Sequence, residues 1–120
     1  MKKQVWVIED DPDIGEIVTF LLDSDGHEVR LFENATSFEN SLRQGEKPDL
    51  FVMDVMLPDG DGVTLCELVK SNYELSSIPV MMMSAHASLD KVRLSCRAEE
   101  FMPKPFDIDE LSAKVQQLLS

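Results

Sequence analysis

The sequence predicts an α/β fold built on one parallel, largely buried sheet. Short apolar runs alternate five times with segments of helical period along the 120 residues. The apolar runs are nearly continuous, which is typical of strands that are covered by helices on both faces. Such alternation gives right-handed crossovers and places helices on both sides of the sheet. We therefore expect a single domain that spans residues 1–120.

Five segments are expected to form the strands of this sheet. They are Gln4–Ile8, Glu28–Phe32, Leu50–Asp54, Pro79–Ser84 and a short strand near Phe101. Polar or turn-forming residues bound these segments, as is usual for buried strands. The stretch 57–62 contains two glycines between the third strand and the next helix, and it is expected to be a loop.

Five helices are expected between and after the strands. The first begins at Asp11-Pro12, because Asp is a good helix cap and Pro fits the first helical position. The second begins at Asn34 or Thr36 and ends at Gly45. A weaker fourth helix spans about Leu89–Cys96. Three helices have apolar stripes. The stripe of the first helix is Ile14, Ile17, Val18, Leu21 and Leu22, and that of the third is Val63, Leu65, Cys66, Leu68 and Val69. The stripe of the last helix is Ile108, Leu111, Val115, Leu118 and Leu119.

Composition limits the functions that are open to this chain. A hydrophobic content of 43% is enough for a core, and no apolar run approaches the roughly 20 residues of a membrane span. No signal-peptide pattern is present, so we expect a cytoplasmic protein in which Cys66 and Cys96 are separate reduced thiols on helices. The net charge of −12 opposes binding to nucleic acid and to anionic membranes, although an attached domain outside this chain would be free to bind DNA.

Polar residues lie at the carboxyl ends of four of the predicted strands. They are Glu9, Asp10 and Asp11 after the first strand, Asp54 at the end of the third, Ser84 at the end of the fourth and Lys104 at the end of the fifth. Ligands bind at this edge in open parallel sheets. Carboxylates, a hydroxyl and an ammonium gathered there would suit a divalent metal and a phosphoryl group.

Four motifs in this order resemble the receiver domain of response regulators in two-component signalling. They are Val-Ile-Glu-Asp-Asp at 7–11, Met-Asp-Val-Met-Leu-Pro-Asp-Gly-Asp-Gly at 53–62, Met-Ser-Ala at 83–85 and Phe-Met-Pro-Lys-Pro-Phe at 101–106. The resemblance covers essentially the whole chain, and the type that it suggests is a chemotaxis-regulator-like receiver. It implies a flavodoxin-like, doubly wound sheet with strand order 2-1-3-4-5.

The resemblance implies a phosphoacceptor with a metal site beside it. Asp54 would accept a phosphoryl group from a phosphohistidine on a sensor histidine kinase or phosphotransfer protein, forming an acyl phosphate. The Mg²⁺ ligands would be chiefly Asp10 and Asp11, with Asp54, the backbone carbonyl of Met56 and, as a lesser participant, Glu9. Two carboxylates about 4 Å apart repel by roughly 4 kcal/mol at an effective dielectric of 20, and a divalent cation would offset this repulsion. Alternatively, Asp11 and Asp13 only cap the first helix, although Asp11 could both cap the helix and bind the metal.

Three further residues have roles implied by the resemblance. Lys104 would neutralise charge on Asp54 and on the incoming phosphoryl group, and its bond to Pro105 is a candidate for the cis form. Ser84 would donate its hydroxyl to a phosphoryl oxygen. Phe101 stands at the position of the switch aromatic, with a core phenylalanine as the alternative.

Some positions depart from the family pattern or leave a role open. Arg97 stands where Gly commonly ends the fourth helix, so a corner that is either strained or rebuilt is expected there. Met56 and His86 flank the expected site and would influence loss of the phosphoryl group. Asp59 and Asp61 do not have the spacing of a calcium-binding EF-hand loop.

Charges on the expected output face argue against tight self-association. Glu100 and Lys114 could form one pair across a dimer, whereas Asp90 would face Glu110 and repel it. We therefore expect a monomer or a weak dimer, with the face kept for another partner.

Three classes of function compete for this sequence. A phosphatase of the haloacid-dehalogenase type needs a second Asp two residues after the nucleophile, and here Met56 stands there. A phosphorylation-independent adaptor would be expected to have lost Asp54, Lys104 or an acidic residue, and all are present. We therefore expect a phosphorylation switch with slow self-catalysed transfer and dephosphorylation, not a turnover enzyme. The output would be carried either by this single domain through a partner or by an effector domain outside this chain, after Ser120.

Overall fold

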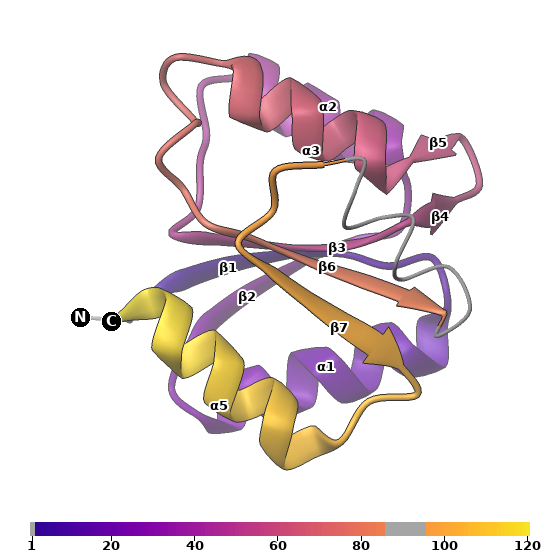
Figure 1. The fold of residues 1–120 in the computed structure, drawn as a ribbon, viewed down its shortest axis with the longest axis vertical. Helices are drawn as coiled ribbons and strands as arrows, with labels where there is room; N and C mark the ends of the chain where they lie inside the picture. The colour runs from indigo at the N-terminus through magenta and orange to yellow at the C-terminus, as the bar shows by residue number, and fades with distance from the viewer. Residues whose placement is uncertain (1, 86–95) are drawn as a thin grey trace.

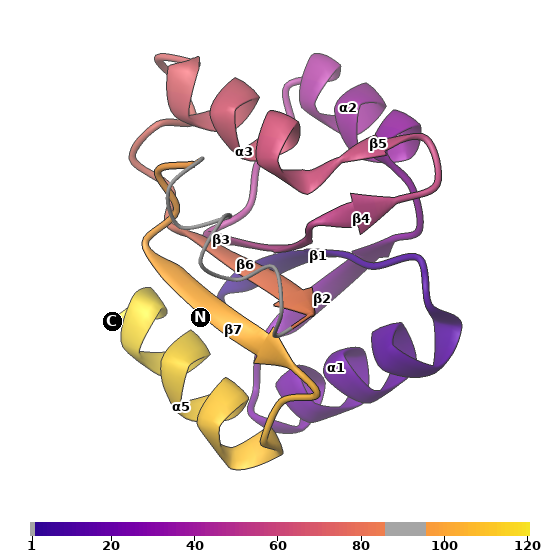
Figure 2. The same ribbon diagram turned by 45° about the vertical axis from the view of Figure 1, so that its right-hand side comes forward.

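The computed structural model describes residues 2–85 and 96–120 as three layers, with a sheet between two pairs of helices (Figure 1). The five parallel strands are β1 (Gln4–Ile8), β2 (Glu28–Phe32), β3 (Leu50–Asp54), β6 (Val80–Ala85) and β7 (Glu100–Lys104). Their order in the sheet is β2-β1-β3-β6-β7, which confirms the predicted topology. Helices α2 (Ala35–Arg43) and α3 (Gly62–Ser71) cover one face, and α1 (Pro12–Ser24) and α5 (Ile108–Leu119) cover the other (Figures 1 and 2).

Alternation along the strands supplies a separate core to each face of the sheet. On β1, Trp6 and Ile8 belong to the core beneath α2 and α3, whereas Val5 and Val7 belong to the core beneath α1 and α5. The first core is aromatic: Trp6 packs edge-on against Phe38 and Phe51 at ring distances of 6.0 and 6.1 Å. Burial of each such large side chain contributes about 1.5–3 kcal/mol to folding.

The strand register brings the carboxyl ends of the strands to one edge. Ile8 lies opposite Met53, Asp54 opposite Met83, and Ser84 opposite Pro103. All five residues of β3 are buried because this strand has neighbours on both sides and helices on both faces. Side chains at the carboxyl ends of β1, β3 and β7 therefore lie at the same edge, although they are far apart in the sequence.

The helix boundaries follow the predicted caps closely. Asp11 caps α1, and Pro12 occupies its first turn. Asn34 rather than Thr36 caps α2, because its side chain accepts a hydrogen bond from the Ser37 amide at 2.8 Å. Gly45 follows the end of α2 with a φ of 85°, a conformation that glycine adopts without strain.

Three residues of the predicted apolar stripes are exposed. Ile17 of α1 is 51% exposed, Leu68 of α3 is 40% exposed and Ile108 of α5 is 53% exposed. The buried side of α1 is centred on Val18 and Leu22, so Ile17 is rotated about 100° away from it. The stripe predicted for α1 was therefore too wide, because Ile17 lies on the outer surface of the helix.

The predicted loop at 57–62 contains a short antiparallel ribbon instead. Strand β4 (Met56–Leu57) pairs with β5 (Gly60–Asp61) across the two-residue turn Pro58-Asp59. Pro and Asp favour such tight turns, which allows the chain to fold back on itself at once.

Of the two alternatives for the corner at Arg97, strained or rebuilt, the structure does not show the strained backbone. Among the described residues, positive φ angles occur only at Gly26 and Gly45. The guanidinium of Arg97 instead bonds to α3, with Nη2 at 2.8 Å from Glu67 and 3.2 Å from the Ser71 hydroxyl. The predicted fourth helix lies outside the described residues except for Cys96, which is not helical.

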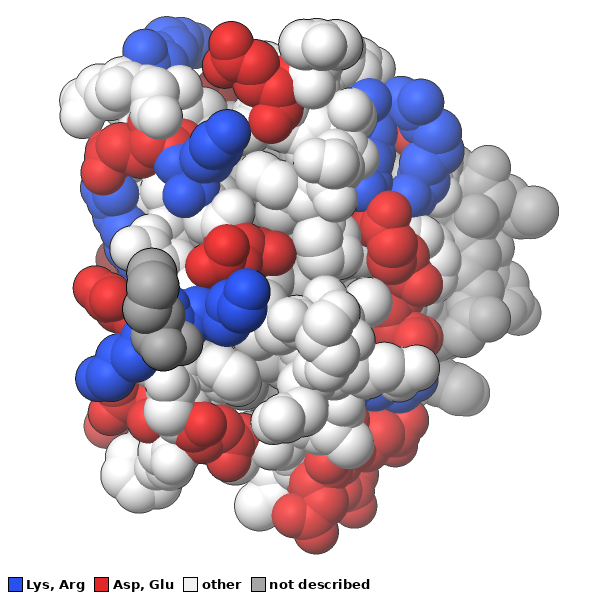
Figure 3. All heavy atoms as spheres, turned by 90° about the vertical axis from the view of Figure 1, so that its left-hand side faces the viewer, with Lys and Arg blue, Asp and Glu red and all other residues white. Residues whose placement is uncertain are grey.

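Charged side chains of both signs lie together on one face of the molecule. Figure 3 views the face at the amino ends of the strands, where lysine and arginine side chains are interspersed with aspartate and glutamate. Within the described ranges, no helix is both long enough and apolar enough to cross a membrane.

Candidate functional site

The candidate site lies at the carboxyl edge of the sheet, which the arrowheads of β6 and β7 mark in Figure 1. Its centre is the ammonium of Lys104, at the end of β7. Lys104 Nζ lies 2.6 Å from Glu9 Oε1 and 3.2 Å from Asp54 Oδ2. The side chain of Glu9 is fully buried, and that of Asp54 is 10% exposed. One cation therefore bridges two carboxylates that water hardly reaches.

Burial and charge act in opposite directions on these groups. Burial raises the pKa of Glu9 to about 7, while the hydrogen bonds from Lys104 and from the Asp11 amide restrain the rise. Burial alone would lower the pKa of Lys104, but its hydrogen bond to Glu9 and the charge of Asp54 raise it above the usual value. The lysine therefore stays charged at neutral pH, and its charge offsets the repulsion between the two acids.

Asp10 completes a group of three acids. Glu9, Asp10 and Asp54 can each offer a carboxylate oxygen such that the three oxygens lie within 4.8 Å of one another. Asp10 is exposed, whereas Glu9 and Asp54 are buried, so the group opens to solvent on the Asp10 side. A set of carboxylate oxygens with an open side fits Mg²⁺, which prefers oxygen ligands and keeps several waters.

Asp11 lies outside this group, and its part as a main metal ligand remains a prediction. Its Oδ1 accepts hydrogen bonds from the amides of Asp13 at 2.9 Å and Ile14 at 3.4 Å. The carboxylate caps α1 and is directed at the helix amides. Glu9 joins the group because it directly follows β1, as Asp54 ends the neighbouring β3.

Ser84 and Phe101 lie on β6 and β7, which are on the opposite side of β3 from β1. Ser84 is buried in β6, one residue beyond the partner of Asp54 in the register. Phe101 is half-buried in β7, where it packs against the core beneath α2 and α3. Their roles in signalling remain predictions.

The other predicted features near the site have mixed outcomes. The peptide bond between Lys104 and Pro105 is cis, as predicted. The side chain of Met56 is 78% exposed, and the role of its backbone carbonyl remains a prediction. His86 and Asp90 lie outside the described residues.

Gly62 permits the chain to return against the end of β3, a requirement that the sequence analysis missed. A Cβ atom at this position would lie 2.0 Å from the backbone oxygen of Asp54 and 3.0 Å from the Cα of Val55. The Gly62 amide donates to the Val55 carbonyl at 2.7 Å. Only a glycine allows α3 to begin so close to the end of β3.

Cys66 and Cys96 are both reduced thiols, as predicted, but only Cys66 lies on a helix. Both are buried in the core beneath α2 and α3, and a hydrogen bond joins their thiols. Burial, reinforced by Cys96, raises the pKa of Cys66 to about 12. At neutral pH this thiol is protonated and therefore a poor nucleophile.

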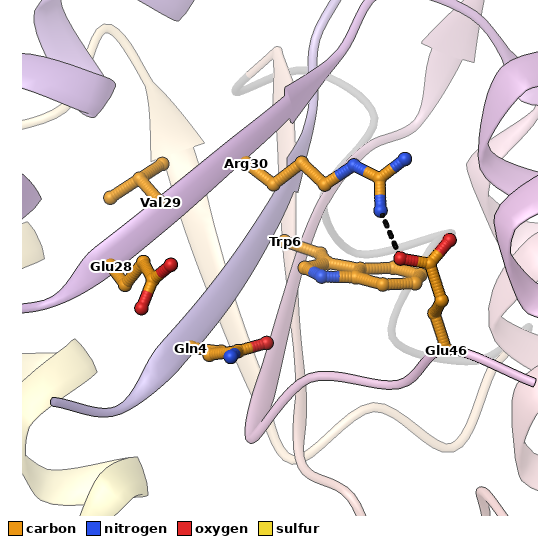
Figure 4. A pocket seen from close by; sticks show the side chains of 6 residues that line it. All are labelled: Gln4, Trp6, Glu28, Val29, Arg30 and Glu46. Carbon is orange, nitrogen blue, oxygen red and sulfur yellow. Dashed lines mark hydrogen bonds and ion pairs between the residues drawn. The ribbon is translucent and has the colours of Figure 1, made fainter. Parts of the chain in front are cut away.

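A hollow of about 390 Å³ lies at the opposite, amino end of the sheet (Figure 4). Arg30 lies over the ring of Trp6 at 5.4 Å and bonds to Glu46 at 2.9 Å. The guanidinium also donates to the Ser41 hydroxyl at 2.7 Å. Its charge is thus already compensated, and the hollow contains none of the three acids around Lys104.

Comparison with known sequences identifies a single family along almost the whole chain. The response regulator receiver domain matches residues 5–116. The chain is 34% identical over 121 residues to the DNA-binding transcriptional regulator NtrC of Proteus hauseri, covering 99% of this chain and 25% of that protein. It is 32% identical over 118 residues to the DNA-binding dual master transcriptional regulator RpaA of Synechocystis sp., covering 97% and 48%. The chain thus spans a quarter to a half of these relatives.

Solved structures agree with this result. The signal receiver domain of a signal transduction histidine kinase from Syntrophus aciditrophicus has a TM-score of 0.90 and 28% identity, covering 98% of this chain and 89% of that one. Full-length FixJ from B. japonicum has a TM-score of 0.84 and 30% identity, covering 99% and 58%. The narrower resemblance to chemotaxis regulators is not supported, because NtrC and RpaA are transcriptional regulators.

Proposed function

The chain belongs to the response regulator receiver domain family, and we propose that it accepts a phosphoryl group on Asp54 from a partner histidine kinase or phosphotransfer protein. The observation that carries this proposal is the bridge of Lys104 between Asp54 and Glu9. A buried carboxylate beside a fixed ammonium can receive an anionic group, since the cation compensates part of the added charge.

In the proposed reaction, an oxygen of the Asp54 carboxylate forms a bond to phosphorus while the bond between phosphorus and the imidazole nitrogen of the donor breaks. The electron pair of the breaking bond stays on the imidazole. The product is an acyl phosphate on Asp54. Lys104 lies on the Oδ2 side of Asp54, where it can hold the carboxylate and attract the phosphoryl oxygens.

Mg²⁺ is the metal that suits this set of donors. We assign Asp10 and Asp54 as carboxylate ligands, Glu9 as a nearby acid that adjusts the charge, and the backbone carbonyl of Met56 as a further ligand. When bound, the ion would neutralise charge on the carboxylates and the transferred group. The three acids carry more negative charge than Lys104 can balance, so a second cation is favourable there.

The proposed signal passes through Ser84 and Phe101. Ser84 is buried one residue beyond the strand partner of Asp54, so its hydroxyl is suitably placed to donate to a phosphoryl group. Phe101 is half-buried two strands away from Asp54, and its change of position would alter the surface around β7 and α5. Phosphorylation would therefore shift an equilibrium between two states of this surface.

The output is proposed to be made by a domain outside this chain. The relatives NtrC and RpaA are DNA-binding regulators of which this chain spans only a part. A net charge of −12 makes the receiver itself a poor ligand for nucleic acid. The domain would thus control an attached or separate effector without touching DNA, acting as a switch and not as a turnover enzyme.

Intact-mass spectrometry after incubation with acetyl phosphate and Mg²⁺ tests this proposal. The wild-type protein should gain one phosphoryl group that hydroxylamine removes, and Asp54→Asn should gain none. Asp49→Asn is a matched control, because Asp49 is an exposed Asp before the amino end of β3. Equal labelling of Asp54→Asn would refute the assignment, absence of labelling would favour an adaptor, and rapid release of phosphate would favour an enzyme.

A further inference from the structure

One carboxylate attaches the ribbon that follows Asp54 to a neighbouring helix. Asp59, at the turn between β4 and β5, has its Oδ1 at 2.7 Å from the Ala35 amide. Its Oδ2 accepts hydrogen bonds from the Thr36 amide at 3.0 Å and from the Thr36 hydroxyl at 2.5 Å. Both donor residues lie in the first turn of α2, 23 and 24 positions away in the sequence.

Charge and close packing both support this attachment. The hydrogen bond from the Thr36 hydroxyl, followed by that from the Ala35 amide, lowers the pKa of Asp59. A carboxylate at a helix N-terminus is also favoured by the helix dipole. Gly60 allows the close approach, because a Cβ there would lie 3.1 Å from the Cβ of Ala35.

The Asp59 contact adds to other contacts that hold the ribbon. Leu57 is buried in the core beneath α2 and α3, whereas the side chain of Met56 is 78% exposed and gives little anchorage. At the far end of the ribbon, Asp61 caps α3 by accepting from the Val63 amide at 2.8 Å. The ribbon therefore contacts the first turns of two helices, α2 through Asp59 and α3 through Asp61.

We propose that Asp59 is a positioning residue for the Mg²⁺ site. By holding the ribbon against α2, it fixes the backbone at Met56, two residues beyond Asp54. It acts through the ribbon and is not itself a ligand. This inference rests on the proposed function, in which the Met56 carbonyl is one of the metal ligands.

Titration calorimetry with MgCl₂ on the unphosphorylated domain tests the inference. Asp59→Ala should weaken Mg²⁺ binding by about tenfold, as loss of a residue that orients a metal ligand commonly does. Asp59→Asn keeps one acceptor oxygen and should fall between Asp59→Ala and wild type. Asp49→Ala is the matched control, because the Asp49 carboxylate accepts a comparable bond from the Gln4 amide at 2.8 Å, at the opposite end of the sheet. It should lower thermal stability without changing Mg²⁺ affinity.

The outcomes separate this inference from the function on which it rests. Unchanged Mg²⁺ affinity in folded Asp59→Ala, or an equal loss in Asp49→Ala, overturns the positioning role alone. Absence of Mg²⁺ binding by the wild-type protein overturns the proposed metal site and this inference with it. If Asp59→Ala does not fold, Thr36→Val removes only one of the three hydrogen bonds. Its Mg²⁺ affinity should then fall measurably, and wild-type affinity in this variant overturns the inference.

Discussion

The carboxylate of Glu9 holds the ammonium of Lys104 at 2.6 Å, closer than the 3.2 Å that separates this ammonium from Asp54. The proposed phosphoacceptor therefore shares its cation with a second, more deeply buried acid. When an anionic group joins Asp54, the lysine can move toward it only by loosening its bond to Glu9. Glu9 thus influences how strongly Lys104 supports the acceptor.

Replacing Asp10 and replacing Asp11 should have different consequences. Asp10→Ala removes a member of the acidic group and should weaken Mg²⁺ binding at least about tenfold. Asp11→Ala removes the cap of α1 and should lower the free energy of unfolding by about 1 kcal/mol, with Mg²⁺ affinity nearly unchanged. Calorimetry and urea unfolding of both variants check this. A larger loss of Mg²⁺ affinity in Asp11→Ala would restore it as the main ligand.

Stability without metal should depend on pH through Glu9. Its pKa in the folded protein is about 7, above the ordinary value of 4.5, so the folded state retains a proton that the unfolded chain has lost. This contribution is complete below pH 4.5 and is lost as the pH rises through 7, amounting to on the order of 2 kcal/mol. Urea unfolding in EDTA at pH 5 and pH 8 measures the loss.

Glu9→Gln is the control for this pH effect. Glutamine has nearly the same shape but no titrating proton, so the variant should lose less stability than wild type between the two pH values. The other acids contribute equally to both proteins and cancel in the comparison. Parallel pH profiles of wild type and variant would show that Glu9 does not titrate near neutrality.

Alanine at position 62 should be strongly destabilising. The added Cβ would meet backbone atoms of Asp54 and Val55, which cannot rotate away, so we expect a loss of about 3 kcal/mol. Gly15→Ala is the contrasting variant, because there the Cβ meets only the end of the Leu31 side chain within a helix that favours alanine. Urea unfolding should show little loss in Gly15→Ala. Similar losses in both variants would contradict the steric argument.

The isolated domain should self-associate weakly or not at all, even after activation. Glu100 and Lys114, which could supply a charge pair across a dimer, already form an ion pair within the chain at 3.2 Å. Forming the pair between chains would exchange one contact for another with little gain. Sedimentation velocity of the beryllofluoride-treated domain measures association. A tight dimer that Lys114→Ala disrupts would show that the pair does exchange between chains.

Local sequence signals predicted most of the fold because they act over a few residues. The continuous apolar run Leu50–Met53 marked β3, and Asp11-Pro12 marked the start of α1. The cap formed by Asp11 is confirmed by its bonds to the helix amides, while its part in metal binding remains a prediction. The position of Glu9 directly after β1 was an available signal for its place beside Asp54.

Contacts between distant segments could not be predicted in the same way. The bonds from α2 to Asp59 join residues 23 and 24 positions apart, and nothing near Asp59 in the sequence distinguishes it from a solvated turn residue. The meeting of Cys66 with Cys96 likewise depends on how α3 packs on the sheet. Such contacts follow from tertiary packing, which local patterns do not encode.

The bond between Glu9 and Lys104 joins residues 95 positions apart, and Lys104 belongs to the last strand of the sheet. During synthesis, which adds about 5–20 residues per second, the chain carries Glu9 and Asp54 for several seconds before it carries their cation. A growing polypeptide that lacks β7 therefore lacks both an edge of its sheet and the charge that its acceptor needs. On the proposed function, a chain could therefore accept a phosphoryl group only after β7 has been made, and incomplete chains would not compete with mature molecules for the donor.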